Sequence, residues 1–508
     1  MKRTSLRGVA TPDALDHIAQ LVDASTDLRE EEGLNASIRL GHQLRRRKLS
    51  SSHSALLSYY NGNAWSALDD IALAVEELDV WKRPTLENLV VSYRSALLRG
   101  TTAELGTNRM CQMFTNLGNS ISTLGRTVEA IEYWDRALEL DPEFGMTIGN
   151  RGCGLSYLAS VDPDLGHQVV LVNQARDDLR SALCLPLELG ASEHFRQRLS
   201  QLERTVSPRA FEAQIDVESH SLGATEAERQ YRQWCLDGRL FLNTLNDLGS
   251  IPIAATDPLM LPDLTASVGD GPHFVGCFNQ MKQEYVSARY ILYDSIRADA
   301  VHYSDRDVTL ANTLDYPCYS LSVEKAKMAF RSAYSLLDKV AFFLNRYLGL
   351  GMKDRDVSLR RIWYEDPRKR GPIRSRVLER ASLPVKALFW LSRDLYEDAP
   401  GYRSAMQPDA QQLSTIRNHI EHRYVKLHQE VWSASASADE PMRDILAFSL
   451  SRGEFESKAL RLLKLARAAL LYLAHAVAIE ERSAAKRREA PRLVAKTALG
   501  KWDDEWKL

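Results

Sequence analysis

One stretch of the chain gathers residue types suited to acid–base and phosphate chemistry. The segment LSTIRNHIEHRYVKLH, residues 413–428, contains two arginines and three histidines: Arg417, Arg423, His419, His422 and His428. A polar helix face with charge pairs, such as Glu421 with Arg417 four residues apart, would explain this composition. The alternative is an arginine followed five residues later by a histidine, with Asn418 directly after the arginine. That spacing occurs twice, at Arg417/His422 and again at Arg423/His428.

Helix geometry limits what the first of these pairs can do within one chain. At 3.6 residues per turn, Arg417 and His422 lie about 140° apart around a helix and roughly 7.5 Å apart along it. Asn418 and His422 are four residues apart and share a face. We therefore expect that Arg417 and His422 of one helix do not converge closely on a single phosphate.

Further residues are candidates for a supporting role. His419 and Glu421 lie on the same predicted helix, while Asp338 and Glu324 lie on a helix predicted over 321–348. Acids on a neighbouring helix could support the site, although such residues more often form surface ion pairs. An aromatic set could stack bases, but aromatic residues at helical spacing are more often core: Trp234, Phe241, Tyr285, Tyr290 and Tyr293.

The charge balance argues against general attraction to nucleic acid. The chain has 508 residues and a formal net charge of −2, so any contact with RNA requires a local basic patch. A solvated helix face or loop is the commoner explanation for such a cluster. The densest cluster, which we take as the candidate RNA-binding surface, is Arg360, Arg361, Arg368, Lys369, Arg370, Arg374 and Arg376.

Several common enzyme classes are disfavoured because their motifs are absent. The sequence has no GxxxxGK[ST] loop, no GxGxxG after a strand, no GxSxG elbow and no HExxH. Its six cysteines are scattered singly and do not cluster with the histidines, so we expect neither a zinc site nor any other metal or cofactor. Reduced thiols, and no run of 18 apolar residues, lead us to expect a cytoplasmic protein without a membrane span.

The elements that position these residues are helices, and two of the helical hairpins repeat. With Leu117 at the seventh position of a 34-residue tetratricopeptide (TPR) repeat, small and large residues fall where that pattern needs them: Gly118, Gly125, Ala130, Trp134, Ala137, Leu138 and Pro142. Small residues let two antiparallel helices approach closely. A shift of 34 residues produces a second match, with Asn150, Gly152, Leu155, Leu158 and Ala159. A single repeat cannot bury both faces, so we expect neighbouring repeats.

No convincing alternating strand is visible, so the fold class predicted is all-α. We expect a TPR-like helical-repeat solenoid over 1–205, with its clearest repeats over 111–178, then a helical connecting region over 206–312. A helical bundle over 313–485 and a basic C-terminal tail over 486–508 would follow. Helices are predicted over 384–397, 409–432 and 442–482, with the linker SASASADE between the last two.

The C-terminal half resembles the HEPN superfamily, and more closely a prokaryotic HEPN subfamily joined to tetratricopeptide repeats. Members carry an arginine, a polar residue, three variable residues and a histidine on an inner helix, which Arg417, Asn418 and His422 match. Arg423 and His428 do not match, because Tyr424 follows the arginine. The resemblance covers roughly half the chain, in the stretches 231–249, 278–294, 314–350, 387–398 and 416–428.

This resemblance implies a metal-independent ribonuclease. His422 would then act as general acid or base on the ribose 2′-hydroxyl or the leaving oxygen, and Arg417 would stabilise the charge on phosphorus. Asn418 would orient the histidine or the phosphate. HEPN domains pair about a two-fold axis, so we expect a homodimer or a higher even assembly with a composite cleft.

Two functions follow as hypotheses. The first is an RNA endonuclease, a toxin or antiviral-defence effector cutting single-stranded RNA such as a tRNA loop, with a protein or peptide partner on the repeats. The second is a non-catalytic scaffold, in which the repeats bind a helix or peptide and the C-terminal half is a dimerisation bundle or a HEPN partner protein.

Overall fold

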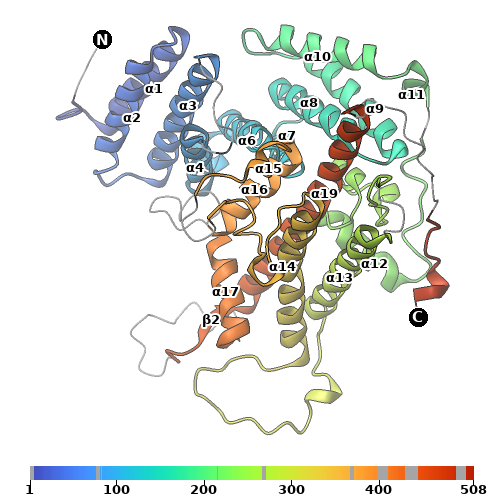
Figure 1. Cartoon of the computed structure of the whole chain (residues 1–508). Helices are drawn as coiled ribbons and strands as arrows, with labels where there is room; N and C mark the ends of the chain where they lie inside the picture. The colour runs from blue at the N-terminus through green and yellow to red at the C-terminus, as the bar shows by residue number, and fades with distance from the viewer. Residues whose placement is uncertain are drawn as a thin grey trace.

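Helices make up nearly all the regular secondary structure of the computed structural model, which confirms the all-α class (Figure 1). It describes residues 5–75, 81, 83–213, 215–265, 271–366, 371–396, 410–429, 444–487 and 499–507. The predicted linker SASASADE and most of the predicted C-terminal tail lie outside these residues.

The first three helices form a small unit with a core of their own. They are α1 (Thr11–Asp27), α2 (Glu31–Leu44) and α3 (Ser51–Val75). Apolar side chains from all three, among them Ile18, Leu34 and Leu57, bury against one another and form a cluster separate from the main core. In Figure 1 this unit lies at one end of the molecule, away from the C-terminal helices.

The two predicted hairpins are present. Helices α6 (Thr107–Thr123) and α7 (Thr127–Leu140) form the first, and α8 (Gly145–Val161) and α9 (Leu165–Leu183) form the second. Trp134 on α7 is buried between Gly118 on α6 and Gly154 on α8, where a Cβ on either glycine would collide with its ring. The indole Nε1 donates to Asn119 Oδ1 at 3.0 Å. The small residues therefore serve the close helix approach that their spacing predicts.

Further helices flank these hairpins on both sides along the chain. Before them come α4 (Pro84–Arg99) and α5 (Thr102–Leu105). After them follow α10 (Ala191–Thr205), α11 (Pro208–Glu212), α12 (Glu226–Asp237) and the short 3-10 helices η1 (Thr244–Leu248) and η2 (Pro252–Ala254).

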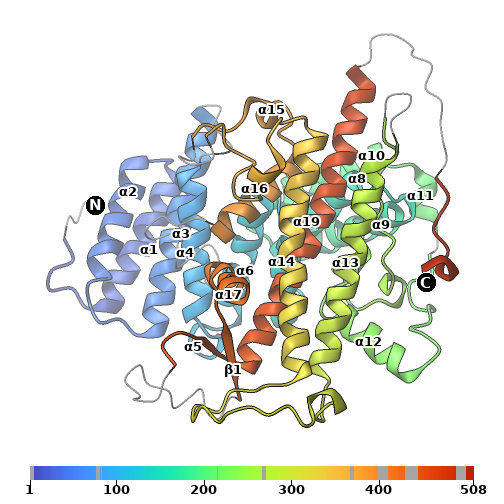
Figure 2. The same ribbon diagram turned by 60° about the horizontal axis from the view of Figure 1, so that its bottom comes forward.

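Three long helices form the centre of the C-terminal half. Figures 1 and 2 both show α13 (His273–Ile296), α14 (Leu321–Tyr347) and α19 (Arg452–Arg487) side by side. The last of them is long and apolar enough to cross a membrane, with a mean hydropathy of 1.6 over its best window. Within the protein 89% of that window is buried, and a central core helix needs the same composition. Helix α16 (Leu383–Tyr396) packs against α19.

The prediction of two helices over 409–432 and 442–482 is wrong at their facing ends. Helix α17 (Ala410–His422) stops ten residues early, and strand β1 (Val425–His428) follows it. Strand β2 (Phe448–Ser451) pairs in parallel with β1, and α19 begins only at Arg452. Val425 and Leu427 of β1 are buried in the core. Four-residue strands are too short for an alternating pattern to identify, and tertiary packing decides them.

The repeat hairpins and the C-terminal helices share one hydrophobic core, which includes Leu117, Leu155, Phe389 and Leu470. Charged groups are buried at the same junction. Arg126 in the turn between α6 and α7 is fully buried and forms ion pairs with Glu129 and with Asp394 on α16. Gly125, at a φ of +81°, lies directly against the Leu383 carbonyl, where no side chain would fit.

Candidate active site on helix α17

The apolar stripe of α17 decides which residues face outward. Leu413, Ile416 and Ile420 recur at helical spacing and are buried against the bundle. That anchoring leaves Asn418 and His422 on the exposed side of the helix. Arg331 on α14 fixes the C-terminal end, because its Nη2 donates to the Ile420 carbonyl at 2.8 Å. The helix therefore presents its polar residues in a fixed orientation.

Arg417 lies half-buried between α17 and α14. Its guanidinium carbon is 5.6 Å from the ring centroid of Tyr334, which is a cation–π distance. Its Nη1 donates to Asn418 Oδ1 at 3.3 Å. The expected pair with Glu421 is absent among the described ion pairs, because Glu421 faces Arg331 at 3.4 Å instead. Among the described residues, Asn418 Oδ1 is therefore the one hydrogen-bond acceptor of the Arg417 guanidinium.

His422 is the last residue of α17 and is exposed. It does not line the cavity that Arg417 lines. The two residues therefore diverge within one chain, as helix geometry predicts.

The ring of His419 contacts the backbone of α17 and a side chain of β2. Its Nδ1 lies 2.9 Å from the Thr415 carbonyl oxygen, and its ring is 5.0 Å from that of Phe448 on β2. His428 is buried within β1. His419 therefore packs against β2 and His428 is part of the strand pair, whereas His422 alone of the three is exposed.

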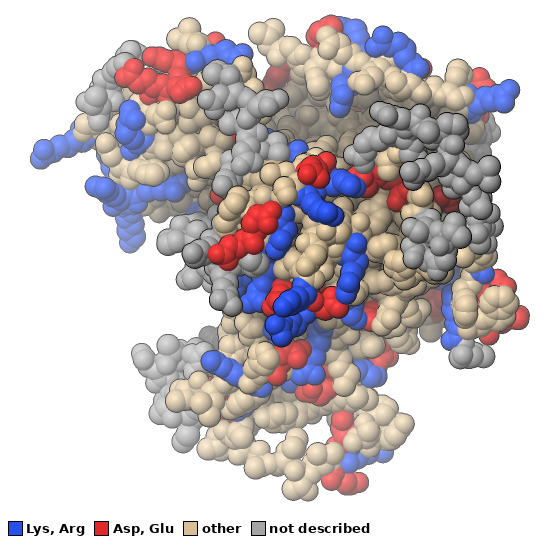
Figure 3. All heavy atoms as spheres, in the orientation of Figure 1, with Lys and Arg blue, Asp and Glu red and all other residues tan. Residues whose placement is uncertain are grey.

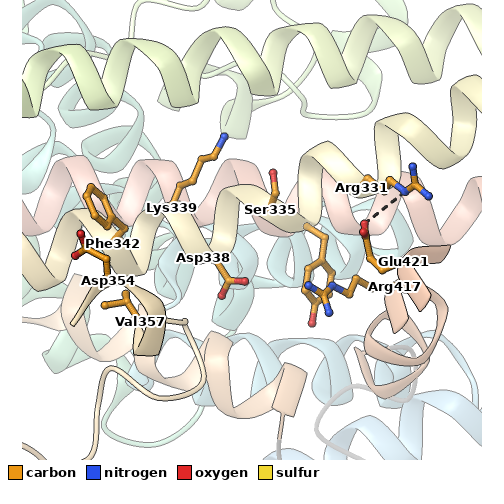
Figure 4. A pocket seen from close by; sticks show the side chains of 10 residues that line it. Arg331, Ser335, Asp338, Lys339, Phe342, Asp354, Val357, Arg417 and Glu421 are labelled. Carbon is orange, nitrogen blue, oxygen red and sulfur yellow. Dashed lines mark ion pairs between the residues drawn. The ribbon is translucent and has the colours of Figure 1, made fainter. Parts of the chain in front are cut away.

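A cavity of about 400 Å³ lies beside Arg417, between α14, α17 and the loop after α14 (Figure 4). Lys339 pairs with Glu284, and Arg346 pairs with Asp354 at 2.7 Å, so most charges at its rim are satisfied. The cavity is lined by Arg331, Tyr334, Ser335, Asp338, Lys339 and Phe342 of α14, and by Asp354, Val357, Arg417 and Glu421.

Asp338 lies in this cavity, and Glu324 does not. The Asp338 Oδ1 accepts from the Leu359 backbone N–H at 3.0 Å, and burial raises the pKa of the carboxyl, with Arg417 opposing that shift. Glu324 is exposed at the start of α14 and pairs with Lys327 at 2.8 Å. Fourteen residues of helix separate the two acids, or about 21 Å, which places Glu324 away from the cavity.

The predicted basic surface is only partly described, because Arg368, Lys369 and Arg370 lie outside the described residues. Arg360 and Arg361 are exposed. Arg374 donates to the Ile362 carbonyl and lies 3.6 Å from Glu365, while Arg376 donates to the Gly349 carbonyl. On the face in Figure 3, acidic and basic side chains are interspersed. The described arginines therefore serve local structure as well as surface charge.

Sequence reasoning missed the contribution of Tyr334. Its spacing with Phe330, Leu337 and Ala341 indicates a core position, and its ring is indeed 5% exposed. Its other role is to stack against the Arg417 guanidinium. That contact depends on how α14 and α17 pack, and a local sequence pattern does not predict it.

Comparison with known families bears on this half of the chain. Residues 265–480 match the family model described as LA2681-like HEPN. This part of the protein is a HEPN domain. No curated protein and no solved structure matches the chain. The HEPN match begins at residue 265, so the domain includes α13 as well as α14, α16, α17 and α19. The N-terminal hairpins lie outside the match.

Proposed function

We propose that the protein is a metal-independent RNA endonuclease whose catalytic residues are Arg417, Asn418 and His422. The observation that supports the proposal is how Arg417, Asn418 and His422 are placed on α17 of the HEPN domain. Arg417 has no carboxylate partner among the described ion pairs, and Asn418 and His422 are exposed beside it. Among the described residues the guanidinium contacts the Tyr334 ring and Asn418 Oδ1, and this leaves it able to bind a phosphate.

In the proposed reaction the ribose 2′-hydroxyl attacks the adjacent phosphorus. His422 takes the proton from this hydroxyl or gives one to the leaving 5′-oxygen. Arg417 stabilises the added negative charge on the phosphate oxygens through its planar donors. The products would be a 2′,3′-cyclic phosphate and a 5′-hydroxyl.

Because Arg417 and His422 diverge on one helix, we propose that the working site is composite. Two chains related by a two-fold axis would each supply one of the two residues to a shared cleft. The helical repeats would hold a protein or peptide partner, and the assembly would act in the cytoplasm as a toxin or defence effector. Both roles extend beyond the HEPN assignment.

The first test is cleavage of tRNA and mixed RNA by the full chain with a chelator present. We expect His422→Ala to reduce cleavage by about a hundredfold or more, as expected for loss of an acid–base group. Arg423→Ala is the matched control, because Arg423 is an exposed cation on the same helix end outside the motif. Undiminished cleavage by His422→Ala, or none by the wild type, would contradict the proposal.

Mixing two inactive variants tests the composite site. In a heterodimer of Arg417→Ala with His422→Ala, one cleft would have both mutations and the other would be intact. Statistical mixing then restores about a quarter of the wild-type rate. If each cleft took both residues from one chain, the mixture would stay inactive.

A further inference from the structure

The cavity beside Arg417 has no role in the cleavage chemistry proposed above. It lies on the α14 side of Arg417, whereas His422 is exposed elsewhere on α17 and does not line it. Its volume of about 400 Å³ falls within the range of small-molecule sites, roughly 300–1,000 Å³. A group bound there would lie next to the phosphate held by Arg417.

The charge of the lining is balanced, which does not suit a phosphate. Three cations, Arg331, Lys339 and Arg417, are matched by three carboxylates from Asp338, Asp354 and Glu421, so the sum is zero. Phosphate sites need excess positive charge or a ring of N–H donors. An uncharged group of a ligand therefore fits the cavity better than the charged RNA backbone does.

The two ends of the cavity offer flat surfaces. At one end the Arg417 guanidinium lies over Tyr334. At the other, Phe342 is 38% exposed, and the Arg346 guanidinium lies 5.6 Å from its ring centroid, so one face of the ring is covered. Figure 4 shows Asp338 between Arg417 and Phe342. Splayed bases of single-stranded RNA stack on aromatic rings and on arginine planes in this way.

Asp338 supplies the polar selectivity. One carboxylate oxygen, Oδ1, is bonded to the Leu359 N–H, and no described residue donates a hydrogen bond to Oδ2. No described cation lies within ion-pair distance of it. A carboxylate with a remaining acceptor selects ligand N–H groups. Among the bases, guanine alone offers two adjacent N–H donors, at N1 and N2, on its Watson–Crick edge.

We propose that this cavity binds a guanine base of single-stranded RNA, with Asp338 accepting hydrogen bonds from its Watson–Crick edge. The inference rests on the proposed nuclease function for its biological meaning, and it makes Asp338 the residue that determines where the RNA is cut. Cleavage would then occur at a fixed position next to a guanine.

The binding test uses the full chain and the four nucleoside 5′-monophosphates in isothermal titration. Because the four ligands share one phosphate, differences in affinity report the base. We expect GMP to bind at least about tenfold more tightly than AMP, CMP or UMP, as a bidentate pair provides. Asp338→Asn keeps an oxygen for the Leu359 N–H but replaces the second acceptor with a donor, so the preference should disappear.

Asp354→Asn is the matched control, since Asp354 lines the same cavity but is exposed and paired with Arg346. It should keep the preference for GMP. Equal binding of the four nucleotides, binding of none, or an unchanged preference in Asp338→Asn would overturn the proposal. Matching circular dichroism spectra and melting curves show that each variant is folded.

Sequencing of cleavage products from a randomised RNA separates this proposal from the nuclease proposal. Cleavage next to guanine in the wild type, with no preference for guanine among the products of Asp338→Asn, supports both. Cleavage without base preference overturns the guanine site alone. Selective GMP binding without any cleavage overturns the nuclease alone.

Discussion

At the scale of residues, Arg417 and His475 show how burial changes what a charged group does. Arg417 is half-buried on Tyr334, where its guanidinium is less hydrated than in water. His475 on α19 is fully buried, with no partner for Nε2 among the described residues. Burial lowers the pKa of His475 to about 4, with Asp162 opposing the shift and Arg482 and Arg467 adding to it.

Replacing Arg417 with lysine tests the need for a planar fork. Lysine keeps the positive charge but presents a point charge without the bidentate geometry. We expect Arg417→Lys to retain the fold and lose roughly tenfold to a hundredfold in the rate of RNA cleavage. The measurement is single-turnover cleavage beside Arg417→Ala. A lysine variant as fast as the wild type would show that charge alone suffices.

His475 should make the free energy of unfolding depend on pH. Its pKa is lower in the folded state than the 6.5 of an unfolded histidine, so the unfolded state binds the proton more tightly. The stability that the neutral His475 contributes to the folded state is complete above pH 6.5, and it is lost as the pH falls toward 4. Between pH 7.5 and 5.5 it amounts to about 1 kcal/mol.

Denaturant unfolding at these two pH values checks this prediction. His475→Leu should reduce the difference in unfolding free energy between them by that amount. The same replacement at the exposed His220 should leave the difference unchanged. An unaltered pH dependence in His475→Leu would mean that other groups account for it.

At the scale of elements, helix spacing depends on small residues at the contacts. Gly118 lies in the middle of α6, where glycine weakens a helix by about 1 kcal/mol relative to alanine. Its retention has a packing reason, because an added Cβ would lie 2.5 Å from the Trp134 Nε1. Gly276 on α13 has nothing within 4 Å of the same position.

These two glycines form a matched pair for mutation. We expect Gly118→Ala to lower the free energy of unfolding by about 1–3 kcal/mol, since the buried indole must move. Gly276→Ala should leave it unchanged or raise it by up to about 1 kcal/mol. Thermal and urea unfolding measure both. Equal effects of the two changes would show that Trp134 adjusts without cost.

At the scale of the whole molecule, the hairpins and the HEPN domain are joined by buried charges as well as apolar packing. Tyr472 on α19 donates to Glu129 on α7, and Arg393 on α16 pairs with Glu87 on α4. Arg126 is fully buried between Glu129 and Asp394, and both carboxylates raise its pKa against the opposing effect of burial. A rearrangement of the repeats would therefore break or shift buried contacts of α16 and α19.

Loss of Asp394 should destabilise both halves together. Arg126 would keep Glu129, but the buried Arg94, whose Nη1 lies 3.6 Å from Asp394, would lose its carboxylate among the described residues, which costs about 3–5 kcal/mol. We expect Asp394→Ala to lower the unfolding free energy by about 3 kcal/mol, within one cooperative transition. Glu203→Ala breaks an exposed pair with Arg180 and should change it by less than about 1 kcal/mol. Separate transitions for the halves, with no effect of Asp394→Ala, would contradict the coupling.

The sequence alone determined the helical class, the two hairpins and the polar stretch around Arg417, because helical spacing, glycines and prolines act over a few residues. It also carried the resemblance to the HEPN superfamily, which the family match over 265–480 confirmed. The early end of α17 and the pair of short strands were decided by contacts between segments more than 20 residues apart.

Only the tertiary structure decided which supporting residues face the site. Asp338 and Glu324 are both acids on α14, yet the packing of α17 places the first in the cavity and leaves the second exposed. It likewise turned Arg417 toward Tyr334 and Glu421 toward Arg331. Local sequence fixes the angle between side chains on one helix, but the neighbouring helix decides which of them is buried.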